Sequence, residues 1–125
     1  MENSSSSGFI ALQKAIEMTT RYRENKHIVI DKAYAGQEIL ATCDTLNKSA
    51  VATLLAKPGC AAIRLYYGMN ELLQVRPILV AVNEKDEDML PDLATLDGEE
   101  DPGEDIVDDA IKCPPLCPPP SPLNP

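Results

Sequence analysis

Residues 60–83 read CAAIRLYYGMNELLQVRPILVAVN, and this stretch decides the fold. Two apolar runs, residues 60–67 and 72–83, are separated by the turn-sized gap GMNE at residues 68–71. Glycine and asparagine tolerate the positive φ angles that tight hairpin turns require. The stretch therefore predicts a long β-hairpin.

The second strand of this predicted hairpin is apolar on both faces. Successive side chains of a strand point to opposite faces, and here Ile78, Val80 and Val82 alternate with Leu79 and Ala81. Such a strand is usually covered on both sides. We therefore expect it to be buried within the fold or paired with another subunit.

The segment before the hairpin carries the signals of a short helix. Asn47 is a favourable N-cap, and Leu46 and Val51 have the spacing of a hydrophobic staple. A Pro-Gly pair then stops the helix. The sequence predicts a helix over residues 48–57.

A longer amphipathic helix is predicted from about Gly8 to Asn25, with Ser7 as its N-cap. We expect its apolar stripe to pack in the core; the stripe consists of Ala11, Ala15, Met18 and Tyr22. The alternating stretch HIVID at residues 27–31 is a candidate third strand. Residues 32–45 mix helix and strand propensities and remain ambiguous.

These elements predict an α+β fold in which two helices pack on one face of a small antiparallel sheet built around the hairpin. The domain covers residues 8–83. A flexible N-terminus at residues 1–7 precedes it, and an acidic, Pro-rich extended tail at residues 84–125 follows. Because so short a domain buries only a small core, we expect a homo-oligomer, with a dimer as the simplest case.

Charge is divided unevenly along the chain. Residues 1–83 carry nine basic and seven acidic side chains, a net charge of +2, whereas residues 84–125 carry two and thirteen, a net charge of −11; together these give −9. The acidic tail repels nucleic-acid backbones and anionic membrane surfaces, and the folded part has no basic stripe. We therefore expect no nucleic-acid partner.

No membrane or secretion signal is evident. The longest unbroken apolar run, residues 78–82, is far too short to span a membrane. The first nine residues, MENSSSSGF, lack the basic and apolar regions of a signal peptide. We therefore expect a cytoplasmic protein with no membrane partner, in which the four cysteines are thiols.

The tail has two parts. Residues 84–109 are strongly acidic and are expected to be extended or disordered. From residue 112 onward proline dominates, with seven prolines among residues 114–125. This composition favours polyproline II and predicts neither helix nor strand.

Four stretches carry a resemblance to a known family: MTTRYRENK (18–26), NKSAVATLLAKPGCAAIRLYYGMN (47–70), VNEKDEDMLP (82–91) and CPPLCPPPSPLN (113–124). The chain resembles a family of small uncharacterised proteins from Bacteroidetes bacteria over most of residues 10–124. The resemblance implies a bacterial cytoplasmic protein. It implies no activity, so no functional residue is transferred by it.

The cysteines allow several kinds of site. Zinc would take Cys113, Cys117 and two of Cys43, Cys60 and His27, although the three-residue gap within the pair is not the usual spacing. A Cys-Pro dipeptide can present a thiolate to haem iron. The pair could also form a redox disulfide. We expect no cofactor, with zinc or haem as the alternative.

Two further groups of residues are candidates. Cys60 with His27 could form a cysteine–histidine nucleophile pair, without any recognised local signature. Arg64, Tyr66 and Arg76 are predicted to share one face of the hairpin and to form a small anion or carboxylate site, for which the acidic tail of the same or a neighbouring subunit is a ready partner.

The absence of catalytic motifs and the division of charge favour a non-enzymatic protein-interaction module. We expect the folded domain to self-associate and the acidic, Pro-rich tail to contact an unknown protein partner. The alternative is a metal- or haem-responsive protein that uses the C-terminal cysteine pair. The third hypothesis is a small cysteine-dependent enzyme.

Overall fold

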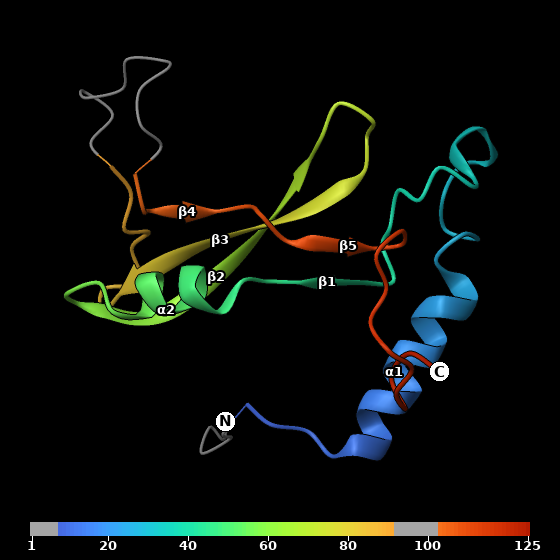
Figure 1. Cartoon of the computed structure of the whole chain (residues 1–125), viewed down its shortest axis with the longest axis horizontal. Coiled ribbons are helices and arrows are strands. Elements are labelled where there is room, and N and C mark those ends of the chain that lie inside the picture. Colours follow the sequence, from blue (N-terminus) through green and yellow to red (C-terminus); the bar gives the residue numbers. More distant parts are fainter. Residues whose placement is uncertain (1–7, 92–102) are drawn as a thin grey trace.

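The computed structural model describes residues 8–91 and 103–125, and Figure 1 shows its arrangement. Three strands form one antiparallel sheet in the order β2-β3-β4, and two form a second sheet, β1-β5. The predicted α+β class is confirmed. The elements in chain order are α1 (Leu12–Asn25), the 3₁₀ helix η1 (Lys32–Tyr34), β1 (Cys43–Thr45), α2 (Lys48–Leu55), β2 (Cys60–Met69), β3 (Val75–Asn83), β4 (Ile106–Val107) and β5 (Ile111–Cys113).

The predicted hairpin is confirmed. Strands β2 and β3 pair antiparallel from Cys60 opposite Asn83 to Met69 opposite Val75. The turn lies slightly later than expected, because Asn70 organises it: its side-chain oxygen accepts the backbone N–H groups of Leu72 at 2.9 Å and of Gln74 at 3.0 Å. An asparagine that bonds the backbone ahead of it is a common way to fix a turn.

Gly68 therefore has a different role from the one the sequence suggested. It lies within strand β2 opposite Arg76. A Cβ atom at this position would lie 2.6 Å from Cδ1 of Ile78. The glycine makes room for the neighbouring strand's isoleucine and does not form the turn.

The core lies between helix α2 and the hairpin. Leu54 and Ala81 are completely buried, and Leu79 is buried beside them. Partly buried apolar residues surround this centre: Leu46, Val51, Cys60, Ile63, Met89 and Val107. Burial of β3 over residues 79–82 agrees with its two apolar faces.

Helix α2 begins as predicted and ends two residues early. The side-chain oxygen of Asn47 accepts the N–H groups of Ser49 at 2.8 Å and of Ala50 at 3.3 Å. This cap satisfies donors that have no partner in the first helical turn. The helix ends at Leu55.

The prediction that both helices cover the sheet is wrong for helix α1. It begins at Leu12, with Ala11 as an N-cap that makes no side-chain bond. It contains no buried residue and lies apart from the three-stranded sheet (Figure 1). Met18, which we expected in the core, is 49% exposed. The helix forms, but its apolar stripe does not pack in the core, because Ala11 and Tyr22 are exposed as well.

Polar contacts hold α1 in place instead. Lys26, which directly follows the helix, is almost fully buried, and its ammonium group donates to the carbonyl of Leu40 and to the hydroxyl of Thr42, both at 3.1 Å. The hydroxyl of Tyr22 donates to the carbonyl of Ala41. The helix is therefore anchored to the segment that leads into β1.

The third strand was misplaced. HIVID at residues 27–31 forms a turn and bend, not a strand. The strand that the ambiguous region does supply is β1, which pairs with β5 in the register Cys43 opposite Cys113 and Thr45 opposite Ile111. Both strands are only three residues long, so neither has enough alternation to be recognised.

The C-terminal segment is part of the fold. Strand β4 pairs with β3, with Val107 opposite Leu79, and β5 pairs with β1. Beyond them, the guanidinium of Arg23 on α1 donates to the carbonyl of Leu123 at 2.6 Å. The prediction of no strand from residue 112 onward is therefore wrong for residues 112–113, and residues 106–107 of the segment expected to be extended or disordered form a paired strand.

Cys113 and Cys117 form a disulfide with a Cα–Cα distance of 4.5 Å. The prediction of four thiols is wrong for this pair, and Cys43 and Cys60 are free thiols. In the described part of the chain, no helix is both long and apolar enough to cross a membrane.

Candidate functional site

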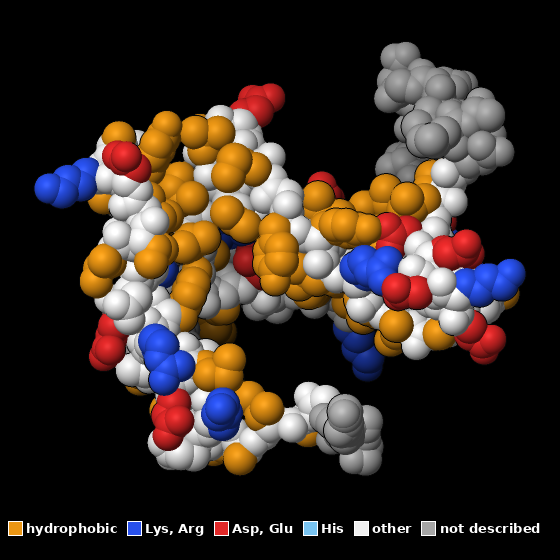
Figure 2. All heavy atoms as spheres, turned by 180° about the vertical axis from the view of Figure 1, so that it is seen from behind, with side chains coloured by type: hydrophobic (Ala, Val, Ile, Leu, Met, Phe, Trp, Pro, Cys, Tyr) orange, Lys and Arg blue, Asp and Glu red, His pale blue; other side chains and the backbone are white. Residues whose placement is uncertain are grey.

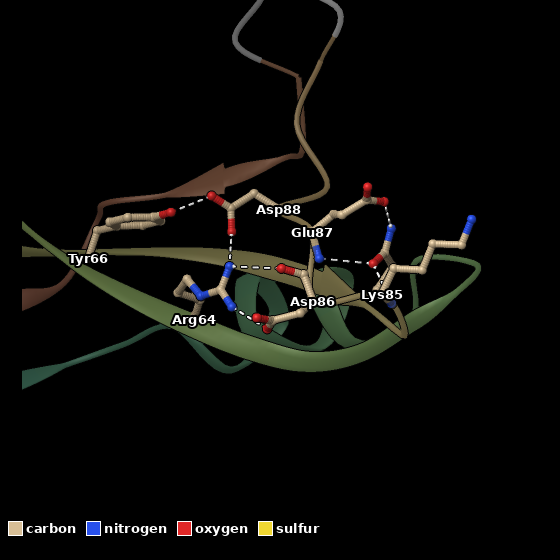
Figure 3. A network of polar contacts seen from close by, with 7 residues as sticks. Arg64, Tyr66, Lys85, Asp86, Glu87 and Asp88 are labelled. Atoms are coloured by element: carbon tan, nitrogen blue, oxygen red, sulfur yellow. Dashed lines mark hydrogen bonds and ion pairs between the residues drawn. The ribbon is translucent and has the colours of Figure 1, made fainter.

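Two of the three predicted binding residues meet carboxylates of their own chain. One guanidinium nitrogen of Arg64 lies 2.6 Å from a carboxylate oxygen of Asp88, and the other lies 2.5 Å from Asp86. The hydroxyl of Tyr66 donates to the second oxygen of Asp88 (Figure 3). The predicted carboxylate site is thus filled by the start of the acidic segment.

The turn after β3 positions these carboxylates. The side-chain oxygen of Asn83 accepts the N–H groups of Lys85 at 2.9 Å and of Glu87 at 3.0 Å. The chain then turns back along β3, where Asp88 bridges to Val82. This geometry brings the carboxylates of Asp86 and Asp88 over the face of β2.

The contacts change the acidities of the groups. The hydrogen bond from Tyr66, followed by the hydrogen bond and charge of Arg64, holds the pKa of Asp88 below its ordinary value of 3.8. The hydrogen bond to Asp88 raises the pKa of the Tyr66 phenol above 10.0. Both shifts favour the charged carboxylate and the neutral phenol, so the cluster is a stable structural contact at neutral pH.

The lowered pKa of Asp88 predicts that the stability of the fold depends on pH. Its folded pKa is depressed, so its stabilising contribution is complete above pH 3.8 and is lost as the pH falls through the lower folded value. We expect Tyr66→Phe to move the pKa of Asp88 back toward 3.8, because it removes the largest cause of the shift. A carbon-detected NMR titration of the Asp88 carboxyl measures this directly.

Tyr67→Phe is the matched control for that titration, since Tyr67 is the neighbouring tyrosine and is 82% exposed. This control should leave the Asp88 titration unchanged. An unaltered Asp88 pKa in Tyr66→Phe would show that the phenol does not hold the carboxylate.

Arg76 does not join this cluster. Its guanidinium pairs with Asp44 of β1 at 2.7 Å and donates to the carbonyl of Ala110, just before β5, at 3.1 Å. Both side chains of the ion pair are largely buried. Arg76 therefore connects the hairpin to the two-stranded sheet and is a structural residue.

The structure places Cys43 beside the bonded pair Cys113 and Cys117 but shows no metal-binding cluster among them. The bridged sulfurs of Cys113 and Cys117 are not thiolate ligands while the disulfide persists. Within residues 8–91 and 103–125, no three His, Cys, Asp or Glu side chains are arranged to hold a metal ion. Cys60 packs on the Leu54 cluster and donates to the carbonyl of Ala62, whereas His27 lies in the turn after α1.

An apolar pocket that the sequence did not predict lies at the tip of the hairpin. It has a volume of about 190 Å³ and is lined by Ile30, Tyr34, Ile39, Met69 and Leu73. Further exposed apolar side chains lie close to the lining residues in the chain, and Figure 2 shows apolar groups gathered on this side of the molecule. We call the following residues the tip patch: Ile28, Val29, Tyr34, Met69, Leu72 and Leu73.

Backbone contacts hold the two sides of this pocket together. The N–H of Val75 donates to the carbonyl of Ile39 at 2.8 Å, and the side-chain amide of Gln74 donates to the carbonyl of Gln37 at 3.1 Å. Hydrogen bonds therefore join the two chain segments that line the pocket. A sequence signal existed: the turn contains Leu72 and Leu73 where polar residues are usual.

A larger hollow of about 350 Å³ lies between α2 and the β4 segment. Its lining mixes small and acidic residues, including Thr53, Glu104, Asp108 and Asp109. These carboxylates disfavour an anionic ligand.

Comparison of the chain with known protein families, with curated proteins and with solved structures gives no match. The resemblance to a Bacteroidetes family therefore stays a prediction, and the functional argument rests on the residues themselves.

Proposed function

We propose that this protein is a non-enzymatic protein-interaction module that self-associates through its α+β domain, with the tip patch of one copy facing the tip patch of a second. The observation that carries the proposal is the apolar pocket at the hairpin tip, together with the exposed apolar side chains around it. Large contiguous apolar surfaces on a folded protein usually mark interaction sites.

The tip patch has the properties of an interface centre. Its apolar side chains are strongly exposed: Ile28 to 75%, Val29 to 73% and Leu72 to 69%. Burial of one such side chain contributes about 1.5–3 kcal/mol. In a two-fold symmetric dimer both copies use the same surface, so the tip patch of each copy would be buried.

A second copy is the occupant that the composition favours. The domain has a small core, which a dimer interface enlarges. Each chain carries a net charge of −9, so two copies repel one another at long range. Association through an uncharged patch should therefore strengthen as salt screens this repulsion, whereas an ion-paired interface would weaken.

The acidic segment is the second part of the proposal, as a contact for a partner with a basic surface. Its support is the exposure of Glu104, Asp108 and Asp109 around β4. Asp105, in contrast, is engaged by Lys57 at 2.5 Å. Acidic side chains that face solvent beside a strand attract and orient a basic partner.

Sedimentation of the full chain over a range of concentrations tests self-association. We expect a monomer–dimer equilibrium that Met69→Glu weakens at least about tenfold, because a charge replaces an apolar side chain at the pocket. Leu55→Glu is the matched control, since Leu55 on α2 is exposed to 56% and Met69 to 58%.

The control should leave the equilibrium unchanged. A wild-type chain that stays monomeric at every concentration, or equal dissociation by both substitutions, would contradict the use of the tip patch. Circular dichroism of both variants verifies that the fold is retained.

A further inference from the structure

Three cysteine residues come together at the two-stranded sheet. In the register of β1 and β5, Cys43 lies directly opposite Cys113. A hydrogen bond from the N–H of Thr42 to the carbonyl of Cys113, at 2.8 Å, fixes this end of the ladder. Cys113 is bonded to Cys117, and Cys43 is a free thiol. A thiol therefore faces a disulfide across one pair of strands.

The backbone geometry allows Cys113 to bond to either neighbour. Facing residues of an antiparallel pair project from the same side and have Cα atoms about 4.5–5.5 Å apart. Disulfides span Cα distances of about 4.4–6.8 Å. The existing bond, with its Cα–Cα distance of 4.5 Å, lies in the same range. A Cys43–Cys113 bond would thus need no displacement of the strands.

Exposure differs among the three cysteines. Cys113 is 2% exposed, whereas Cys43 is half-buried and Cys117 is exposed. A solvent-borne reagent therefore reaches Cys117 most readily, whereas the buried Cys113 has Cys43 as its neighbour across the ladder. Access of this kind decides which sulfur of a disulfide is attacked.

We infer that Cys43, Cys113 and Cys117 form a thiol–disulfide exchange site whose substrate is an exposed disulfide. In the first step the Cys43 thiolate, after losing its proton to solvent, attacks the Sγ of Cys113. The Cys43–Cys113 bond forms and the Cys113–Cys117 bond breaks. The electron pair leaves on the Sγ of Cys117. No oxidant is consumed, because one disulfide replaces another.

In the second step the released Cys117 thiolate attacks the substrate disulfide. A mixed disulfide forms at Cys117, and the other substrate sulfur leaves as a thiolate that takes up a proton. The buried Cys43–Cys113 bond meanwhile keeps Cys113 from re-forming the original bond with Cys117. This activity does not depend on self-association through the tip patch.

Trypsin distinguishes the two disulfides of the intact chain. Cleavage after Lys32, Lys48 and Lys112 places Cys43 in peptide 33–48 and both C-terminal cysteines in peptide 113–125. A Cys113–Cys117 bond leaves peptide 113–125 closed on itself, whereas a Cys43–Cys113 bond links the two peptides. Oxidised glutathione is the probe, with acid quenching and alkylation before digestion.

We expect wild-type protein to yield linked peptides 33–48 and 113–125 with glutathione on Cys117. Cys43→Ser should lower glutathionylation of Cys117 at least about tenfold, because nothing then releases that thiolate. Cys60→Ser is the matched control, since Cys60 is the other free cysteine, and should leave the products unchanged. Cys117→Ser should be oxidised wholly to the Cys43–Cys113 form.

The wild-type measurement needs no substitution, so a variant that fails to fold does not obscure the result. The inference is overturned if no linked peptide forms in wild type, or if Cys60 links to Cys113 as readily as Cys43 does. Digestion of chain that was exchanged in denaturant supplies the reference for random pairing.

Discussion

Leu54→Ala is expected to lower the free energy of unfolding by about 3 kcal/mol, within the range of about 2–5 kcal/mol for fully buried leucines. Leu54 is completely buried and lies at the centre of the cluster formed with Leu79 and Ala81. The substitution removes apolar contact and leaves a cavity between α2 and the hairpin. Urea unfolding followed by circular dichroism measures the change.

Leu55→Ala is the matched control for this experiment, because it is the adjacent leucine of the same helix and is 56% exposed. It should change the stability by less than about 0.5 kcal/mol. Similar losses for both substitutions would show that α2 does not place Leu54 in the core.

Arg76→Met is expected to lower the stability by about 2 kcal/mol. Breaking a fully buried ion pair costs about 3–5 kcal/mol, and this pair retains some exposure, 16% for Arg76 and 20% for Asp44. The substitution removes the guanidinium partner of the largely buried Asp44 carboxylate. It also removes the bond to the carbonyl of Ala110.

A double-mutant cycle with Asp44→Leu isolates the pair from the other contacts. We expect the double variant to be more stable than the sum of the two losses predicts, because it leaves no unpaired buried charge. Strictly additive losses would mean that Arg76 and Asp44 do not interact. Arg64→Met provides a comparison, since one partner of Arg64, Asp86, is 84% exposed.

The parts of the fold with strong local signals were predictable. The hairpin and helix α2 each contain their own start, stop and apolar pattern within a short stretch of chain. Asn47 as the cap of α2 was identified by residue type and position alone. Such elements need no knowledge of distant residues.

The remaining parts depend on partners far away in the sequence. β1 and β5 are three-residue strands separated by most of the domain, and a prolyl residue directly follows Cys113. Helix α1 shows why amphipathicity is insufficient: its pattern indicates an apolar face but not what covers it. The tip patch was missed because a turn was assumed to be polar.

The sequence predicted the type of ligand at the binding residues but not which residues form the site together. Arg64 and Tyr66 do bind carboxylates, and these come from Asp86 and Asp88 in the segment assigned to the tail. Alternation along the strands placed Arg76 with them. Its long side chain instead reaches Asp44, which no local pattern reveals.

The pairing of β1 with β5 has a consequence for the order in which the chain folds. A ribosome releases the hairpin and α2 as one continuous stretch, so this unit can assemble during synthesis. β1 emerges earlier still, yet its hydrogen-bonding partner is made more than sixty residues later (Thr45 pairs with Ile111). Until then β1, which contains Asp44, has no partner strand, and Cys43 does not yet face Cys113. Residues 111–113 therefore complete a sheet that residues 43–45 began.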